Sequence, residues 1–173
     1  VSVLLQFGGE LTLETRGFVY LGPGVSSQSL TQGWQAGGEA LSFGLYDFAP
    51  GVPMQVLWKQ GASSVSVSGT PSGLLVNASL TVTTPLLPSA GVWDLELVQN
   101  AGAPNEKRVL QPGAWLANAP SLLSIAPASA YQGGGETVTL SLAGFTASAS
   151  ARVRLGAAEA FGTIVGNLSA SQV

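Results

Sequence analysis

Side chains that commonly carry catalysis are sparse in this sequence. It has no histidine and no cysteine, which excludes a Ser–His arrangement, a catalytic thiolate, disulfides and the usual zinc sites. The acidic residues are dispersed, and no D-x-D run gathers the several oxygen ligands that calcium needs. Paired carboxylates for glycoside hydrolysis would need a cleft, which small sandwich folds seldom offer. We therefore expect no enzymatic activity, no metal and no cofactor.

Two further kinds of ligand are disfavoured by charge and hydropathy. The six basic residues are scattered and the net charge is -3, so no basic stripe exists for nucleic acid. The Gly-rich run at 133–136 lacks the Lys-Ser/Thr of a phosphate loop. No apolar run approaches the roughly 18–20 residues that a membrane span requires. We expect neither nucleic-acid binding nor membrane insertion.

The tryptophans are the strongest candidates for ligand contact, because a flat ring can stack on a sugar. Alternation nevertheless favours the core for three of them: Trp58, Trp93 and Trp115. Trp34 differs, since it precedes a Gly-rich turn, and we weigh an inter-domain or inter-subunit contact for it against simple loop packing. Carbohydrate binding stays a weak alternative.

Composition favours an exported protein. Charged residues make up only 9% of the chain and hydrophobic ones 46%. Two N-glycosylation sequons occur, at Asn77 and Asn167. Together with the absence of cysteine, these features predict an extracellular, secreted or cell-surface location.

Strand-like alternation runs through the chain, and helical periodicity is nearly absent. Segments such as ALSFGLYDF, PMQVLWKQ, ASLTVTT and ETVTLSLAGF alternate apolar and polar residues between clusters of Gly, Pro, Asn and Ser. This pattern predicts an all-β sandwich fold.

An internal repeat relates each residue i to residue i+97. The run GWQAGGEALSFGLYDF (33–48) aligns without gaps to AYQGGGETVTLSLAGF (130–145), so that Trp34 matches Tyr131 and Phe48 matches Phe145. Further matches are Pro23 with Pro120 and Phe18 with Trp115. The repeat predicts tandem sandwich domains of about one hundred residues each.

The repeat also predicts where the domains divide. Residues 1–21 match the closing two strands of the complete repeat, with Val1, Val3 and Leu5 at the positions of Trp93, Leu95 and Leu97. Residues 22–118 then form a complete domain. Residues 119–173 form the front part of another, which lacks the last strands.

The C-terminal part resembles the front of an IPT/TIG domain, an immunoglobulin-like family. The resemblance lies in a Pro-bearing first strand, a Gly-Gly turn, an apolar strand ending in Gly-x-Phe, and a V-x-x-Gly strand. The matching residues are Pro127, Gly134, Gly135, Val138, Leu140, Gly144, Phe145, Val153 and Gly156. The complete repeat departs from this pattern at Leu30, Asp47 and Lys59. The resemblance implies tandem immunoglobulin-like sandwiches of the kind found in extracellular proteins.

The predicted function is structural: a subunit of an extracellular filament or surface array, with other copies of itself as partners. A domain without its last strands exposes an unpaired edge, and the hairpin of a neighbouring copy has the pattern to fill it. The alternatives are a piece of a longer multi-domain stalk, with neighbouring domains as partners, or a carbohydrate-binding module. The residues we expect at the subunit interface are Val1, Val3, Leu5, Phe7, Leu11, Leu13, Phe18, Tyr20, Trp34 and Tyr131.

Overall fold

The protein is all-β, as its sequence predicts. The computed structural model describes residues 3–7, 10–14, 22–145, 150–155 and 157–163. Every helix or strand assigned within these ranges is a β-strand. Accordingly, this part of the chain holds no helix with the length and apolar character to cross a membrane.

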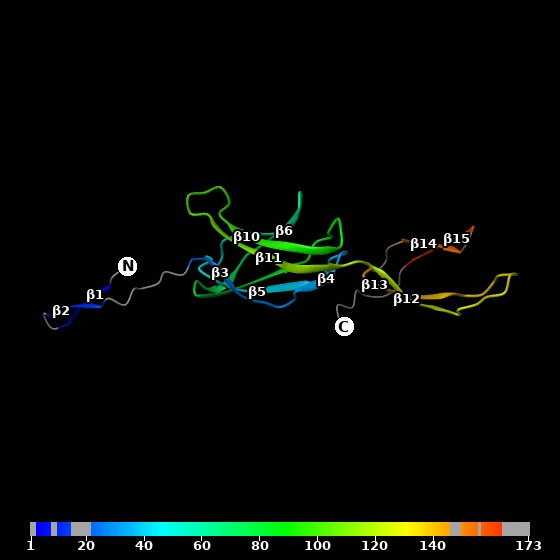
Figure 1. Cartoon of the computed structure of the whole chain (residues 1–173), viewed down its shortest axis with the longest axis horizontal. Helices are drawn as coiled ribbons and strands as arrows, with labels where there is room; N and C mark the ends of the chain where they lie inside the picture. Colours follow the sequence, from blue (N-terminus) through cyan, green and yellow to red (C-terminus); the bar gives the residue numbers. More distant parts are fainter. Residues whose placement is uncertain (1–2, 8–9, 15–21, 146–149, 156, 164–173) are drawn as a thin grey trace.

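The central part of the chain contains two sheets that face each other (Figure 1). The first has the order β3-β5-β9-β8, and all its neighbours are antiparallel. The second has the order β4-β11-β10-β6-β7, in which only β4 and β11 are parallel. The strands are β3 (Gly24–Gln28), β4 (Gln32–Trp34), β5 (Ala40–Tyr46), β6 (Met54–Gln60), β7 (Ser63–Gly69), β8 (Ser72–Leu74), β9 (Asn77–Thr83), β10 (Gly91–Gln99) and β11 (Lys107–Asn118).

Alternation in the sequence becomes alternation of burial in the first sheet. In β5 the side chains of Leu41, Phe43 and Leu45 are buried, whereas the residues between them are exposed or half-buried. In β9 Ala78, Leu80 and Val82 do the same. Successive side chains of a strand point to opposite faces, so both strands direct their apolar face into the space between the sheets.

Three tryptophans form the centre of the core. Trp58 on β6, Trp93 on β10 and Trp115 on β11 are all 0% exposed, which confirms the core position predicted for them. The rings of Trp58 and Trp115 meet edge to face, with centroids 6.5 Å apart and an angle of 89° between their planes. The second sheet therefore supplies the largest side chains of the core.

One hairpin precedes this sandwich in the sequence, and two antiparallel strand pairs follow it. They pair β1 with β2, β12 with β13, and β14 with β15, all antiparallel. Their strands are β1 (Val3–Phe7), β2 (Glu10–Glu14), β12 (Ser121–Ala126), β13 (Thr139–Ala143), β14 (Ser150–Leu155) and β15 (Ala158–Thr163).

The β12–β13 pair repeats the register of the β3–β5 pair. Gly24 pairs with Tyr46, and the residues 97 positions later, Ser121 and Ala143, pair in the same way. Both pairs contain a register shift, after Val25 in one and after Leu122 in the other. The alignment of the two segments thus extends from residue types to backbone pairing.

The β1–β2 hairpin has the register of β10–β11, the last two strands of the sandwich. Val3 pairs with Glu14 where Leu95 pairs with Gln111. The five pairs of β1–β2 match five consecutive pairs of β10–β11, and the connecting loop is five residues shorter. The two hairpins therefore share their backbone pairing and differ in the length of the connecting loop.

The constant offset fails at one point in the C-terminal part. Met54 on β6 pairs with Gly69, so the offset would pair Ala151 with position 166. Ala151 pairs instead with Gly162, because β14 ends at Leu155, the equivalent of Trp58, whereas β6 continues two residues further to Gln60 before its turn.

The buried tryptophans predict a large stability difference between core and surface substitutions. Replacing Trp58 with Ala removes a fully buried ring and should lower the free energy of unfolding by about 3–5 kcal/mol. Leu86→Ala is the control, because Leu86 is 71% exposed and its loss should change stability by less than about 0.5 kcal/mol. Urea unfolding of the two variants measures the contrast, and equal losses would contradict this description of the core.

Candidate functional site

The structure divides the predicted interface residues of the hairpin between its two faces. Val3, Leu5 and Phe7 pair with Glu14, Thr12 and Glu10, whereas Leu11 pairs with Gln6 and Leu13 with Leu4. Residues directly opposite in an antiparallel pair share a face, so the β1 set and the β2 set occupy opposite faces of the hairpin. The remaining predicted residues of this region, Val1, Phe18 and Tyr20, lie outside the described residues, as does the sequon residue Asn167.

The other predicted residues lie at the surface. Tyr131 is 84% exposed, and Asn77 is exposed at the start of β9. Trp34 is half-buried at the end of β4.

A buried carboxylate organises the turn that follows Trp34. The backbone N–H of Trp34 donates to Glu39 Oε1 at 2.7 Å, and the hydroxyl of Thr84 donates to Glu39 Oε2 at 2.5 Å. The Gly37 N–H donates to the Trp34 carbonyl at 3.0 Å, and Gly37 and Gly38 both have positive φ. Because Glu39 is only 6% exposed, these contacts satisfy a carboxylate that would otherwise be costly to bury.

The same turn occurs after Tyr131. The Tyr131 N–H donates to Glu136 Oε2 at 3.1 Å, and the Gly134 N–H donates to the Tyr131 carbonyl at 3.0 Å. Gly134 and Gly135 have φ values of 72° and 89°, against 69° and 98° at Gly37 and Gly38. The repeated Gly-Gly-Glu marks this turn in the sequence, but the hydrogen bond from the aromatic residue to the glutamate was not predicted.

Trp34 packs against the C-terminal part of the chain. A Cβ placed on Gly144 would lie 2.5 Å from Trp34 Cε3 and 3.1 Å from the Cα of Pro120. Gly144 is buried and has φ of 74°, so its conformation favours glycine, and its surroundings leave no room for a Cβ. The structure thus brings Trp34, Pro120 and Gly144 together, whereas Tyr131 has no such cover.

The position equivalent to Gly144 in the central sandwich is Asp47, whose φ is 59°. Its carboxylate Oδ1 lies 2.7 Å from Lys107 Nζ, and Lys107 also donates to the Asp47 carbonyl. The side chains remain 17% and 25% exposed. A half-buried ion pair therefore stands where the C-terminal part has a bare glycine.

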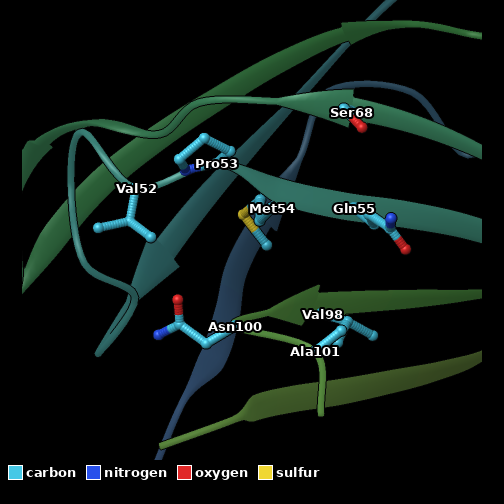
Figure 2. Close-up of a pocket in the computed structure, with 8 residues that line it drawn as sticks. All are labelled: Val52, Pro53, Met54, Gln55, Ser68, Val98, Asn100 and Ala101. Atoms are coloured by element: carbon cyan, nitrogen blue, oxygen red, sulfur yellow. The ribbon is translucent and has the colours of Figure 1, made fainter. Parts of the chain in front are cut away.

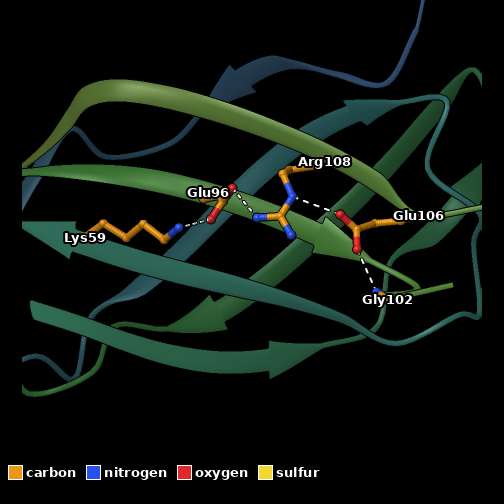
Figure 3. A network of polar contacts seen from close by, with 5 residues as sticks. All are labelled: Lys59, Glu96, Gly102, Glu106 and Arg108. Carbon is orange, nitrogen blue, oxygen red and sulfur yellow. Dashed lines mark hydrogen bonds and ion pairs between the residues drawn. The ribbon is translucent and has the colours of Figure 1, made fainter. Parts of the chain in front are cut away.

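A second polar network crosses the outer face of the five-stranded sheet (Figure 3). Glu96 on β10 is only 5% exposed. Its Oε1 lies 2.6 Å from Nη1 of Arg108, and its Oε2 forms an ion pair with Nζ of Lys59. Arg108 also binds Glu106 at 2.9 Å. Burial by itself would raise the pKa of Glu96, but hydrogen bonds from Lys59 and Arg108 and their positive charges outweigh it, so its pKa is lowered.

Among the described residues, an open depression lies at one end of the sandwich, where β6, β7 and β10 meet (Figure 2). Its volume is about 280 Å³, and none of its lining residues is acidic or basic. Among the described residues, no three acidic side chains converge to form a metal site. The lining residues are Val52, Pro53, Met54, Gln55, Ser68, Val98, Asn100 and Ala101.

No known protein-family model matches the sequence, and no curated protein matches it either.

Two glycines with the same backbone conformation provide a test of the Trp34 contact. Gly144→Ala and Gly134→Ala both place a Cβ at positive φ, which should cost about 1 kcal/mol each. Only Gly144→Ala also overlaps the Trp34 ring, since nothing lies within 4 Å of a Cβ at Gly134. We expect Gly144→Ala to lose about 1–3 kcal/mol more in urea unfolding. Most of the excess should disappear in a Trp34→Ala background, where only the Cα of Pro120 stays close to the added Cβ, and an undiminished excess there would contradict the contact.

The lowered pKa of Glu96 predicts a pH-dependent contribution to stability. The pKa of Glu96 in the folded protein lies below its value of about 4.5 in the unfolded chain. The ionised carboxylate therefore stabilises the folded state more than the protonated form does. The difference in unfolding free energy between the parent chain and Glu96→Gln should be about 1 kcal/mol near pH 7. It should shrink as the pH falls through the folded pKa. Urea titrations at pH 7, 5 and 3 measure it, and a difference independent of pH would contradict this role.

Proposed function

We propose that this protein is a non-enzymatic structural subunit of an extracellular filament or cell-surface array, built from tandem immunoglobulin-like sandwiches of the IPT/TIG type. Its strand order supports the fold. Immunoglobulin-like sandwiches pair strands A, B, E and D in one sheet and C, F and G in the other. The sheets β3-β5-β9-β8 and β4-β11-β10-β6-β7 have this order, with β4 as a continuation of the first strand that switches sheets.

Repetition of backbone pairing supports the tandem arrangement. The β12–β13 hairpin shares register and register shift with β3–β5, and the turns after Trp34 and Tyr131 share their hydrogen bonds. Two units of one architecture, joined in sequence and in contact through Trp34 and Gly144, are suited to a mechanical or spacing role.

Two observations together carry the proposal: the half-covered apolar residues of the C-terminal part, and a hairpin of matching register at the start of the chain. Phe48 is 0% exposed in the central sandwich, but its equivalent Phe145 is 38% exposed. Val138, Leu140 and Leu142 are half-buried where Leu41, Phe43 and Leu45 are buried. The strands that would cover them are the equivalents of β10 and β11, and β1–β2 has that register.

Completion of this core by the hairpin of a neighbouring copy would join copies head to tail. An apolar face left uncovered and an unpaired strand edge are both unfavourable in water, so a strand with the right alternation is recruited. The contact is between two different surfaces, so it propagates as a filament and does not close a dimer. A stalk of successive units in one longer chain would use the same pairing within that chain.

The low charge of the sequence is consistent with surfaces that are largely covered by neighbours. Three of the four tryptophans are buried and the fourth packs on Gly144, so none of them forms an exposed platform for stacking on a sugar.

Two leucines of the hairpin provide a matched test of assembly. Leu5 is equivalent to Leu97, which is 0% exposed, whereas Leu13 is equivalent to Leu110, which is 51% exposed. Leu5→Asp would place a charge in the completed core and should abolish filaments, as should deletion of residues 1–20. Leu13→Asp should leave them unchanged.

Light scattering and electron microscopy of the parent chain and these variants provide the measurement. Filaments of the parent chain, lost in Leu5→Asp and retained in Leu13→Asp, are the expected result. A parent chain that stays monomeric, with its own hairpin on its own C-terminal unit, would contradict the filament.

A further inference from the structure

We propose that the Tyr131 side chain of one copy packs on Pro23 and Asp47 of the next copy, as Trp34 packs on Pro120 and Gly144 within one chain. This inference rests on the proposed head-to-tail assembly. It assigns the exposed tyrosine a partner of stated chemistry, a second copy of this chain, and it names the residues that meet.

The contact within one chain defines the geometry of a junction between units. Trp34 stands at the end of β4, beside the last residues of β11, since Asn118 pairs with Trp34. The chain then leaves β11 and enters the next unit at Pro120, and the Trp34 ring reaches across to Gly144. The junction thus consists of one aromatic ring from the first unit and a proline and a left-handed residue from the second.

Each element of this junction has an equivalent on the free surfaces of the molecule. Tyr131 precedes the same backbone turn as Trp34, with the same two hydrogen bonds, and is 84% exposed. Pro23 precedes β3 as Pro120 precedes β12, and Asp47 has the left-handed conformation of Gly144. When the hairpin of a second copy completes the C-terminal unit, that copy continues directly into Pro23. The equivalent junction then places Tyr131 against Pro23 and Asp47.

The two junctions differ in shape and charge: one pairs Trp34 with Gly144, and the other would pair Tyr131 with Asp47. An indole ring rests on Gly144, which has no side chain, and a Cβ at that position would overlap the ring. At the other junction the left-handed residue carries a carboxylate, paired with Lys107 and partly exposed. The narrower tyrosine ring leaves more space there, its hydroxyl can donate to the carboxylate, and its face can receive the ammonium group.

The two junctions would therefore differ in the aromatic residue that each accepts. Trp34 opposite Asp47 would combine a broad ring with a Cβ and a charge, and Tyr131 opposite Gly144 would leave a gap. Each aromatic residue therefore fits one junction better than the other. The pairing favours assembly in which junctions within a chain alternate with junctions between chains.

Crosslinking tests the contact directly, because the chain contains no cysteine. Tyr131→Cys and Asp47→Cys are made as separate variants, mixed in equal amounts, assembled and treated with a short bismaleimide. We expect a covalent dimer in the mixture and none in either variant alone. Val76→Cys in place of Tyr131→Cys is the matched control, since Val76 is 77% exposed in the turn between β8 and β9.

The outcomes separate this inference from the proposed function. Filaments of normal appearance that yield no more dimer than the Val76→Cys control would overturn the Tyr131 contact and leave head-to-tail assembly standing. A parent chain that stays monomeric would overturn both.

A second pair of variants covers the case in which the cysteine substitutions themselves block assembly. Tyr131→Trp alone should raise the concentration needed for filaments by about tenfold, because the broader ring overlaps Asp47. Adding Asp47→Gly recreates between copies the tryptophan–glycine pair that Trp34 and Gly144 form within one chain. It should return the concentration needed for filaments to that of the parent chain. Equal assembly of Tyr131→Trp and the parent chain would overturn the inference.

Discussion

The structure depends on the burial of Trp58, Trp93 and Trp115 between two sheets. Two of these rings belong to the hairpin formed by β10 and β11, so that hairpin supplies much of the core as well as two interior strands of the five-stranded sheet. A sandwich of this type therefore has no complete core until its last two strands are in place. Leu140 and Leu142 on β13 are half-buried, whereas Phe43 and Leu45 at the equivalent positions of the central sandwich are buried.

The core is coupled to the junction through glycine and a buried carboxylate. A Cβ on Gly33 would lie 2.5 Å from the Trp115 ring and 3.1 Å from the carboxyl carbon of Glu39, so β4 lies directly over the core. Glu39 in turn receives the Trp34 N–H and the Thr84 hydroxyl, which fixes the turn and the start of the aromatic side chain. The position of Trp34 at the end of the sandwich is thus a consequence of how Trp115 packs.

Sequence periodicity predicted the strands and the core tryptophans well, because both depend on local alternation. The internal repeat was predicted from residues that match at an offset of 97, and the shared registers of β3–β5 and β12–β13 agree with it. Periodicity did not separate the two faces of the first hairpin: Leu11 and Leu13 alternate as well as Val3 and Leu5 do. Which face a strand shares with its partner depends on the number of residues in the turn, and alternation within one strand contains no information about that number.

The sequence by itself determined the all-β class, the spacing of the strands and the identity of the aromatic residues in the core. These follow from the period of two in a half-buried strand and from the preference of large apolar side chains for burial. Only the tertiary structure decided that Trp34 meets Gly144, that Lys107 pairs with Asp47 and that Glu96 joins Lys59 to Arg108. Such contacts join residues far apart in the chain, and they arise from the order and register of strands across the sheets.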